Sequence, residues 1–197
     1  MSQTILAELE ILKQGVLTCR RCRLRDGCQQ VVFGEGRPGL LVIGEGPGAE
    51  EDRQGRPFVG AAGQLLDKIL AAGGFDRQVN AYIANVVKCR PPSNRVPTAQ
   101  ECAACLPHLE AQIKILKPKI VLLLGATALQ AVLKTPQGIT RLRGKWQERD
   151  GIYYMPTFHP AALLRDPRRK ADVWQDMQLL VAKYREEVDP NHTSPYC

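Results

Sequence analysis

Four short apolar runs, each followed by a stretch with helical character, constrain the fold of this chain more than any other feature. The runs occupy residues 40–43, 81–87, 120–124 and 152–155. The predicted helices occupy residues 4–17, 63–72, 99–116, a segment that starts at 125, and 172–187. Strands that alternate with helices form a mainly parallel sheet with helices packed on its faces. We therefore expect an α/β fold with a central, mainly parallel four-stranded sheet flanked by helices.

The length of 197 residues fits one domain with its own hydrophobic core. We expect this domain to span residues 1–190, with a cysteine-rich segment near the N-terminus, and residues 191–197 to form a flexible tail. The longest apolar run, Ile120 to Leu124, is too short to cross a bilayer, and acidic residues interrupt the N-terminal segment where a signal peptide would be apolar. These features predict a cytoplasmic protein without membrane contact, and we expect it to be a monomer.

The charge balance indicates the kind of partner. Lysine and arginine number 27 against 20 acidic residues, which gives a net charge of +7 and a pI near 9.2. A basic chain of this kind favours a polyanionic partner, with nucleic acid the first candidate and an anionic membrane surface the second. A basic protein without such a partner is the alternative, and charge alone does not decide between them.

Seven cysteines in a chain without an export signal favour metal ligation over disulfides. Cys19 and Cys22 form a C-x2-C pair, whereas Cys89, Cys102 and Cys105 lie far away in sequence. The first pair with Cys102 and Cys105 resembles a zinc site, whereas the first pair with Cys89 and Cys105 would hold an iron–sulfur cluster. Spacing does not decide between the two. The remaining thiols, and the first candidates to be inert, are Cys28 and Cys197.

Three polar loops follow predicted strands: GEGPGAEED, KCRPPSNR and FHPAALLRDPRR. The carboxyl ends of parallel strands lie at one edge of a sheet, so we expect these loops to converge there on one ligand site. The first loop is neither a Walker A motif nor a Rossmann fingerprint. Its glycines still allow the backbone N–H groups near Gly46 to approach a ligand closely.

Three side chains in or beside these loops are suited to binding a base. Phe58 lies among glycines and prolines, where an aromatic ring could stack on a base or anchor the loop to the core. Asn85 interrupts an apolar strand, so its amide needs hydrogen-bond partners, which a base edge would supply. His159 precedes Pro160 after a strand, and either faces the same pocket or bonds the backbone of a turn. Each residue alone favours a structural role, whereas their coincidence predicts a site.

Together, the motifs GEGPGAEED, GRPFVGAAG, NVVKCRPPSNR and FHPAALLR and the cysteines resemble family 4 uracil-DNA glycosylases. The resemblance runs from Cys19 to Asp176. It implies the uracil-DNA glycosylase fold and hydrolysis of the N-glycosidic bond of deoxyuridine in DNA, which leaves an abasic site for base excision repair. It also implies that a [4Fe–4S] cluster ties the N-terminal segment to the fold and that Cys102 is spare. The ligands implied for this cluster are Cys19, Cys22, Cys89 and Cys105.

The resemblance implies roles for the pocket residues. Phe58 would stack on the flipped uracil, and Asn85 would bond its O4 and N3–H edge, which distinguishes uracil from cytosine. His159 and the backbone near Gly46 would stabilise the negative charge that develops on uracil O2. The family 1 enzymes carry a catalytic aspartate in GQDPYH where this chain has Gly46, so the carboxylate must come from elsewhere.

We expect one of the nearby acids to stabilise the developing positive charge on the sugar and to orient water, as glycosidase carboxylates do. Glu51 is the first choice, followed by Asp52 and Glu45. A related class traps abasic DNA through a histidine in a basic insert of the KRRIH type, and this chain has PPSNRVPTAQE there. We therefore predict turnover without a covalent bond to DNA.

The last loop resembles the family's intercalation loop. Leu163 or Leu164 would wedge into the space that the flipped nucleotide leaves. The basic residues predicted to contact phosphates are Arg165, Arg168, Arg169, Lys170, Arg141, Arg143 and Lys145. The implied partner is uracil-containing DNA in the nucleoid, with a sliding clamp or other repair proteins as further partners. The competing hypothesis is a noncatalytic metal- or cluster-bearing nucleic-acid-binding module.

Overall fold

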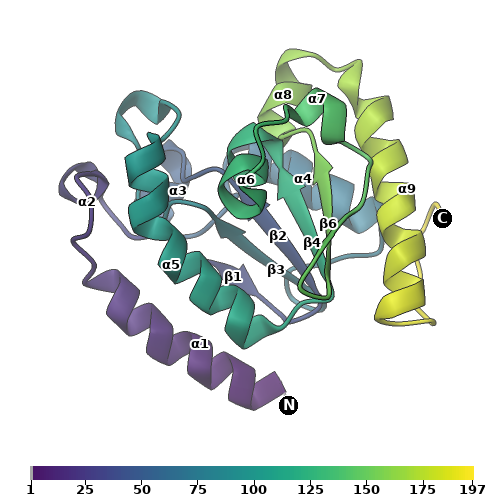
Figure 1. Ribbon diagram of the computed structural model, residues 1–197, viewed down its shortest axis with the longest axis horizontal. Helices are drawn as coiled ribbons and strands as arrows, with labels where there is room; N and C mark the ends of the chain where they lie inside the picture. Colours follow the sequence, from purple (N-terminus) through teal and green to yellow (C-terminus); the bar gives the residue numbers. More distant parts are fainter. Residues whose placement is uncertain (1) are drawn as a thin grey trace.

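A six-stranded sheet forms the centre of the protein (Figure 1). The computed structural model describes residues 2–197; Met1, the first residue of the predicted domain, lies outside them. The strand order is β1-β3-β2-β4-β6-β5. The strands are β1 (Glu35–Gly36), β2 (Leu40–Gly44), β3 (Ala81–Asn85), β4 (Ile120–Leu124), β5 (Gln147–Arg149) and β6 (Ile152–Thr157).

The four predicted strands are the four inner ones, β3, β2, β4 and β6, and they are parallel as expected. The predicted total of four omits β1 and β5, which pair antiparallel at the two edges. These edge strands have two and three residues, and neither is fully buried. Segments that are so short and so polar carry no periodic apolar signal, which is why the sequence did not predict them.

Helices follow the inner strands and cover the sheet. The predicted helices are all present, and their observed ends lie within a few residues of the expected ones. The sequence did not predict the short helices. Among them, α3 matters most for function because it contains acidic residues of the first loop. The helices are α1 (Ser2–Leu17), α2 (Leu24–Gly27), α3 (Ala49–Gln54), α4 (Ala61–Ala72), α5 (Ala99–Leu116), α6 (Gly125–Leu133), α7 (Ile139–Leu142), α8 (Pro160–Arg165) and α9 (Arg169–Glu187), with a 3-10 turn at Pro92–Asn94.

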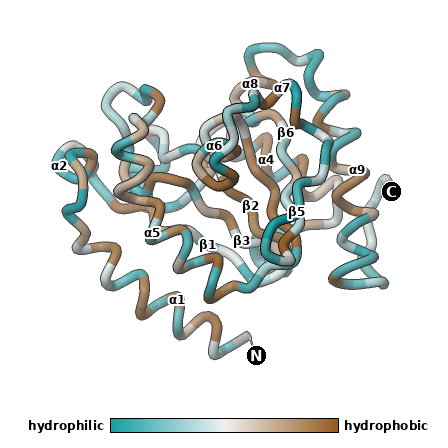
Figure 2. Tube along the Cα trace, viewed as in Figure 1, coloured by the Kyte–Doolittle hydropathy of each residue, from teal (hydrophilic) through white to brown (hydrophobic). Residues whose placement is uncertain are grey.

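Alternate residues of the inner strands enter two separate cores, one on each face of the sheet. Leu41 and Ile43 of β2 belong to the core beneath α1, α5 and α6, whereas Leu40 and Val42 belong to the core beneath α4, α8 and α9. Figure 2 shows these strands as the hydrophobic centre of the molecule. Figure 1 shows α1 running alongside α5, so the N-terminal segment packs on the outside of one helical layer. Because both faces are buried, the sheet edge at the strand ends is where a ligand has access.

Residues 191–197, for which we predicted a flexible tail, make defined contacts with the fold. The His192 ring stacks on Phe75 with centroids 4.5 Å apart, and its Nε2 lies 2.8 Å from the Gly73 carbonyl oxygen. The Ser194 hydroxyl donates to the Ala72 carbonyl at 2.7 Å. The Tyr196 ring also packs edge-on against Trp174, so two aromatic side chains of this polar segment contact the fold. None of the helices in residues 2–197 has the length and apolar character that crossing a membrane requires.

Candidate active site

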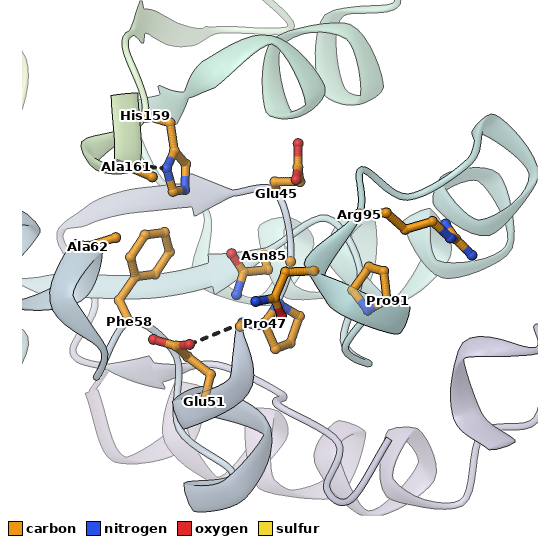
Figure 3. A pocket seen from close by; sticks show the side chains of 13 residues that line it. Glu45, Pro47, Glu51, Phe58, Ala62, Asn85, Pro91, Arg95, His159 and Ala161 are labelled. Atoms are coloured by element: carbon orange, nitrogen blue, oxygen red, sulfur yellow. Dashed lines mark hydrogen bonds between the residues drawn. The ribbon is translucent and has the colours of Figure 1, made fainter. Parts of the chain in front are cut away.

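A cavity of about 270 Å³ lies at the carboxyl ends of the inner strands, where the three polar loops meet as predicted (Figure 3). Loops after β2, β3 and β6 all contribute to its lining. The predicted site residues that line it are Glu45, Gly46, Glu51, Phe58, Asn85 and His159. This position is the ordinary ligand site of an open α/β sheet.

Phe58 forms one wall of the cavity, between α3 and α4. Its ring centroid lies 5.6 Å from that of His159, and the two planes are tilted by 33°. Figure 3 shows the two rings bordering the same space, with the Asn85 side chain next to them. The backbone of Phe58 has φ +52°, a left-handed conformation that is unfavourable for a bulky residue. A planar ligand can stack on this ring, which the surrounding chain must hold in place.

Asn85 ends β3 and points into the cavity with its side chain almost completely buried. Its Oδ1 is buried and has no hydrogen-bond partner among residues 2–197. A buried acceptor without a partner is costly unless a ligand supplies a donor. Gly44 packs so closely here that a Cβ atom would lie 2.5 Å from this oxygen and 2.4 Å from the Phe58 ring.

His159 caps the N-terminus of α8, and this contact determines its tautomer. Its Nδ1 accepts the Ala161 N–H at 3.2 Å, so the proton of the neutral imidazole lies on Nε2. Burial, followed by the charge of Arg165, lowers the pKa of His159 to about 4, although Glu51 opposes the shift. At neutral pH the side chain is therefore an uncharged imidazole that offers one N–H donor.

Glu51, our first choice for the catalytic carboxylate, is occupied by backbone hydrogen bonds. Its Oε2 accepts the Gly48 N–H at 3.0 Å, as part of the capping box of α3. Its Oε1 accepts the N–H groups of Val59 and Gly60, both at 2.8 Å. Glu51 lines the cavity, but the contacts of its carboxylate fold the Phe58 loop onto α3.

The other two acids differ in position. Asp52 is buried away from the cavity, where Oδ1 accepts the N–H groups of Gln29 at 2.9 Å and Gln30 at 3.3 Å. It therefore holds the chain before β1, which corrects its prediction as a catalytic candidate. Glu45 lines the cavity, and its Oε2 accepts a hydrogen bond from the Thr127 hydroxyl. Within residues 2–197, no hydrogen-bond donor contacts its other carboxylate oxygen.

Neighbouring leucines in α8 have opposite environments. Leu163 is 1% exposed and packs in the core beneath α9, so it cannot be the predicted wedge. Leu164 is 50% exposed. Consecutive helical residues point about 100° apart, which is why only one of two adjacent leucines reaches the surface. Figure 2 shows that the connection from α8 to α9 is hydrophilic.

The basic residues predicted to contact phosphates fall into two groups, those held by ion pairs within the protein and those exposed at the surface. Arg143 forms an ion pair with the buried Asp176 at 2.7 Å and lies 5.7 Å from the centre of the Phe158 ring. It therefore ties α9 to the end of α7 and does not project toward solvent. This corrects its prediction as a DNA contact. Arg168 and Arg169 pair with Asp166 at 2.9 and 3.4 Å. The exposed cations of the predicted set are Arg165, Arg168, Lys170, Arg141 and Lys145.

The loop after β3 supplies pocket residues that sequence reasoning did not single out. Pro91, Asn94 and Arg95 line the cavity. Figure 3 shows Pro91 and Arg95 on the side opposite Phe58. Arg95 is fixed by Glu101 at 2.7 Å, inside the capping box that starts α5. The signal was the position of KCRPPSNR directly after a strand, but nothing in the motif showed which of its residues face inward.

A second, narrow cavity of about 20 Å³ lies between the N-terminal segment and α5. The four predicted ligands, Cys19, Cys22, Cys89 and Cys105, all line it, whereas Cys102 lines a separate groove. In residues 2–197, no three or more His, Cys, Asp and Glu side chains lie close enough together to hold a metal ion as they stand. The structure thus gathers the predicted thiols at one place without arranging them as a coordination sphere.

Lys88 lies between the two cavities and is 1% exposed. Its Nζ donates to the Asn85 carbonyl at 2.9 Å and to Gln112 Oε1 at 2.5 Å, and its backbone N–H lies 3.3 Å from Cys105 Sγ. Burial lowers the pKa of Lys88 to about 8, and the nearby Cys105 opposes the shift. No carboxylate among the described residues pairs with this buried cation. An anionic group in the thiol-lined cavity would supply the missing charge.

Comparison with known proteins agrees with this geometry. The model of the uracil DNA glycosylase superfamily matches residues 31–178. The chain is 46% identical to the type-4 uracil-DNA glycosylase of Thermotoga maritima over 80% of this chain and 84% of that protein. It is 40% identical to the enzymes of the same name from Sulfurisphaera tokodaii and Pyrobaculum aerophilum, over 92% and 87% of this chain and 89% and 92% of theirs. The chain therefore belongs to the uracil-DNA glycosylase superfamily, within its type-4 branch.

Proposed function

We propose that this protein is a monofunctional DNA glycosylase that excises uracil from DNA. The observation that carries the proposal is the unpartnered, buried Oδ1 of Asn85 beside the Phe58 ring and the neutral His159. An acceptor of this kind fits the N3–H of uracil, while the amide Nδ2 can donate to O4. Cytosine has an acceptor at N3 and a donor at its N4 amino group, so the same amide orientation leaves its edge unmatched.

Uracil must leave the duplex before it reaches this cavity, at a cost of about a few kcal/mol of lost pairing and stacking. Leu164 is the side chain that fills the vacated space, supported by its exposure at the surface of α8. The exposed cations of the α7 and α8 regions contact the phosphates on both sides. Stacking on Phe58 then offsets part of the lost base stacking.

Cleavage of the bond from C1′ to N1 leaves its electron pair on the uracil and positive charge on the sugar. The Nε2–H of His159 and the backbone near Gly46 stabilise the uracil anion, since donors fixed in advance need no reorganisation during the reaction. A neutral imidazole suits this role because its tautomer is fixed by the Ala161 N–H. Water then adds to C1′ and releases a proton that neutralises the uracil anion, so the products are free uracil and an abasic site.

Glu45 is the carboxylate we assign to the sugar side of the cavity. Support comes from the exclusion of the alternatives, because Glu51 accepts three backbone N–H groups and Asp52 lies outside the cavity. Glu45 has one oxygen engaged by Thr127. The other is available to orient water and to stabilise the oxocarbenium ion.

We further propose that Cys19, Cys22, Cys89 and Cys105 bind a [4Fe–4S] cluster. The support is their shared cavity, the exclusion of Cys102 from it, and the buried ammonium of Lys88 beside it, which a four-thiolate cluster with net negative charge would balance. The cluster, when bound, ties α1 and α2 to α5. We expect the enzyme to act as a cytoplasmic, nucleoid-associated monomer, with a sliding clamp or other repair proteins as possible contacts of its free surface.

The test is release of free uracil from an oligonucleotide with a single deoxyuridine, by the intact, cluster-loaded chain and by two matched variants. We expect Glu45→Gln to lower kcat by about 10²-fold or more while the melting temperature stays near that of the parent. Glu51→Gln should instead lower the melting temperature, because two loop N–H groups lose a charged acceptor. The opposite pattern would return the catalytic role to Glu51. Normal DNA binding without uracil release by the parent would leave the noncatalytic binding module as the function.

A further inference from the structure

The most strained segment of the pocket wall is the one that carries the stacking ring. Phe58 has φ +52°, which a residue with a Cβ atom and a bulky ring adopts only where its surroundings enforce it. Gly63 of α4 lies directly against this backbone, since a Cβ there would come within 2.1 Å of the Phe58 carbonyl carbon. The orientation of the ring therefore depends on contacts to its main chain.

Arg77 supplies the contacts on the carbonyl side. It lies in the connection from α4 to β3, and its side chain is 10% exposed. One terminal nitrogen donates to the Pro57 carbonyl at 3.0 Å, and the other donates to the Phe58 carbonyl at 3.0 Å. The same two nitrogens bond Glu35 at 2.7 Å and Asp67 at 2.5 Å. The guanidinium is thus fixed by two carboxylates while it holds two successive carbonyls.

The opposite side of the same loop is held by an anion. Glu51 accepts the N–H groups of Val59 and Gly60, the next two residues along the chain. Three successive peptide groups are therefore bound by side chains: the first through its oxygen, the second through both its oxygen and its nitrogen, and the third through its nitrogen. A loop held in this way keeps its left-handed residue without help from a ligand.

We propose that Arg77 is a positioning residue that sets the Phe58 ring for stacking on the substrate base. The inference rests on the proposed function, since it assumes that Phe58 is the stacking surface. Only arginine can make these contacts, because its planar fork directs several N–H groups at once, whereas lysine offers a single point charge. Arg77 touches no substrate and acts through Phe58 alone.

The first test compares Arg77→Lys with Arg56→Ala. Arg56 also pairs with Glu35, at 2.8 and 2.9 Å, but makes no hydrogen bond to the carbonyls of the Phe58 loop. We expect Arg77→Lys to lower kcat/KM for uracil release by roughly 10- to 100-fold and to weaken product inhibition by free uracil, because the ring is displaced. Arg56→Ala should stay within about twofold of the parent. Equal effects of the two variants would mean that Arg77 acts only as an ion-pair partner, and would overturn the proposal.

The second test is a double-mutant cycle with Phe58→Ala. If Arg77 acts through the ring, Arg77→Lys should cause little further loss of kcat/KM once the ring is absent. Losses that multiply would overturn the inference while uracil release by the parent still supports the proposed function.

A third measurement does not depend on activity. Amide hydrogen exchange at Val59 and Gly60 should rise in Arg77→Lys and stay unchanged in Arg56→Ala, because loss of the carbonyl contacts frees the loop. Unchanged exchange in Arg77→Lys would contradict the proposal even if the parent released no uracil.

Discussion

The cavity lined by Phe58, Asn85 and His159, here called the base pocket, and the thiol-lined cavity differ in how far they are built in advance. In the base pocket, His159, Glu51 and the Phe58 loop all have defined hydrogen-bond partners, and the cavity measures about 270 Å³. In the thiol-lined cavity of about 20 Å³, four cysteines from three segments of the chain line the same space. The sulfur of Cys19 lies 3.2 Å from His108 Nε2, and the sulfur of Cys105 lies 3.3 Å from the backbone nitrogen of Lys88.

The pocket residues and the cysteines differ in this way because they lie on different kinds of segment. The pocket residues follow strands of one sheet, so the register of the sheet fixes them relative to one another. The cysteines come from the segment between α1 and α2, from the loop after β3 and from α5. Ligands drawn from separate segments are brought together by the metal itself, whose binding free energy is then part of the folding free energy. Activity should therefore depend on the pocket, and stability of the N-terminal segment on the cluster.

The largest effect is expected from His159→Asn. Asparagine can still cap α8, but its shorter side chain does not reach the uracil O2, so one donor to the anion is lost. We expect kcat to fall by about 10²- to 10³-fold with little change in melting temperature. Single-turnover kinetics and thermal melting of the same preparation would measure both. A loss below about threefold would show that His159 is a helix cap and no more.

Substitution of the cysteines tests metal binding and stability, whereas substitution of His159 tests activity. Cys89→Ser should lose most of the bound iron and lower the melting temperature, whereas Cys102→Ser should retain both, because Cys102 lines another groove. Iron content and the charge-transfer absorbance of the cluster measure the first quantity. If Cys102→Ser lost the metal and Cys89→Ser kept it, the ligand set would be wrong. A colourless zinc protein would contradict the cluster itself.

A smaller effect tests how tightly the pocket is packed. Gly44→Ala adds a methyl group within 2.5 Å of both the Phe58 ring and Asn85 Oδ1, so one of them must move. We expect a loss of about 1–3 kcal/mol in the free energy of unfolding and about a tenfold lower kcat/KM. Gly15→Ala in α1 is the matched control, because nothing lies within 4 Å of its added methyl. It should be neutral or stabilise the helix by up to about 1 kcal/mol.

The smallest effect concerns pH. Burial lowers the pKa of His159 from 6.5 to about 4, so the unfolded chain binds more protons between these values. The stability that neutral His159 contributes is therefore complete above about pH 6.5 and is lost as the pH falls toward 4. The difference in melting temperature between the parent and His159→Asn should shift against the parent between pH 7.5 and 4.5. A kcat/KM profile of the parent with a His159-dependent midpoint near 6.5 would contradict a neutral, buried imidazole.

Sequence patterns predicted the inner sheet and the convergence of the loops, whereas the choice of the four cysteines came from the family resemblance. The patterns could not rank the carboxylates, because the role of Glu51 depends on N–H groups eight and nine residues further along the chain. Nor could they separate Leu163 from Leu164, since burial of one face of α8 depends on where α9 packs. The structural role of Arg143 could not be predicted either, because its partner Asp176 lies 33 residues away in the sequence. Periodicity reports local structure, whereas these assignments depend on long-range contacts.

The central claim is that the base pocket excises uracil repeatedly and without covalent attachment to DNA. The most direct measurement counts free uracil released per protein chain from an excess of duplex with one deoxyuridine, with deoxycytidine and thymidine duplexes beside it. We predict many uracils per chain, no release from the other two duplexes, and no protein–DNA band that survives denaturation. One uracil per chain with a denaturation-resistant band, or no uracil from protein that binds the duplex normally, would contradict the account.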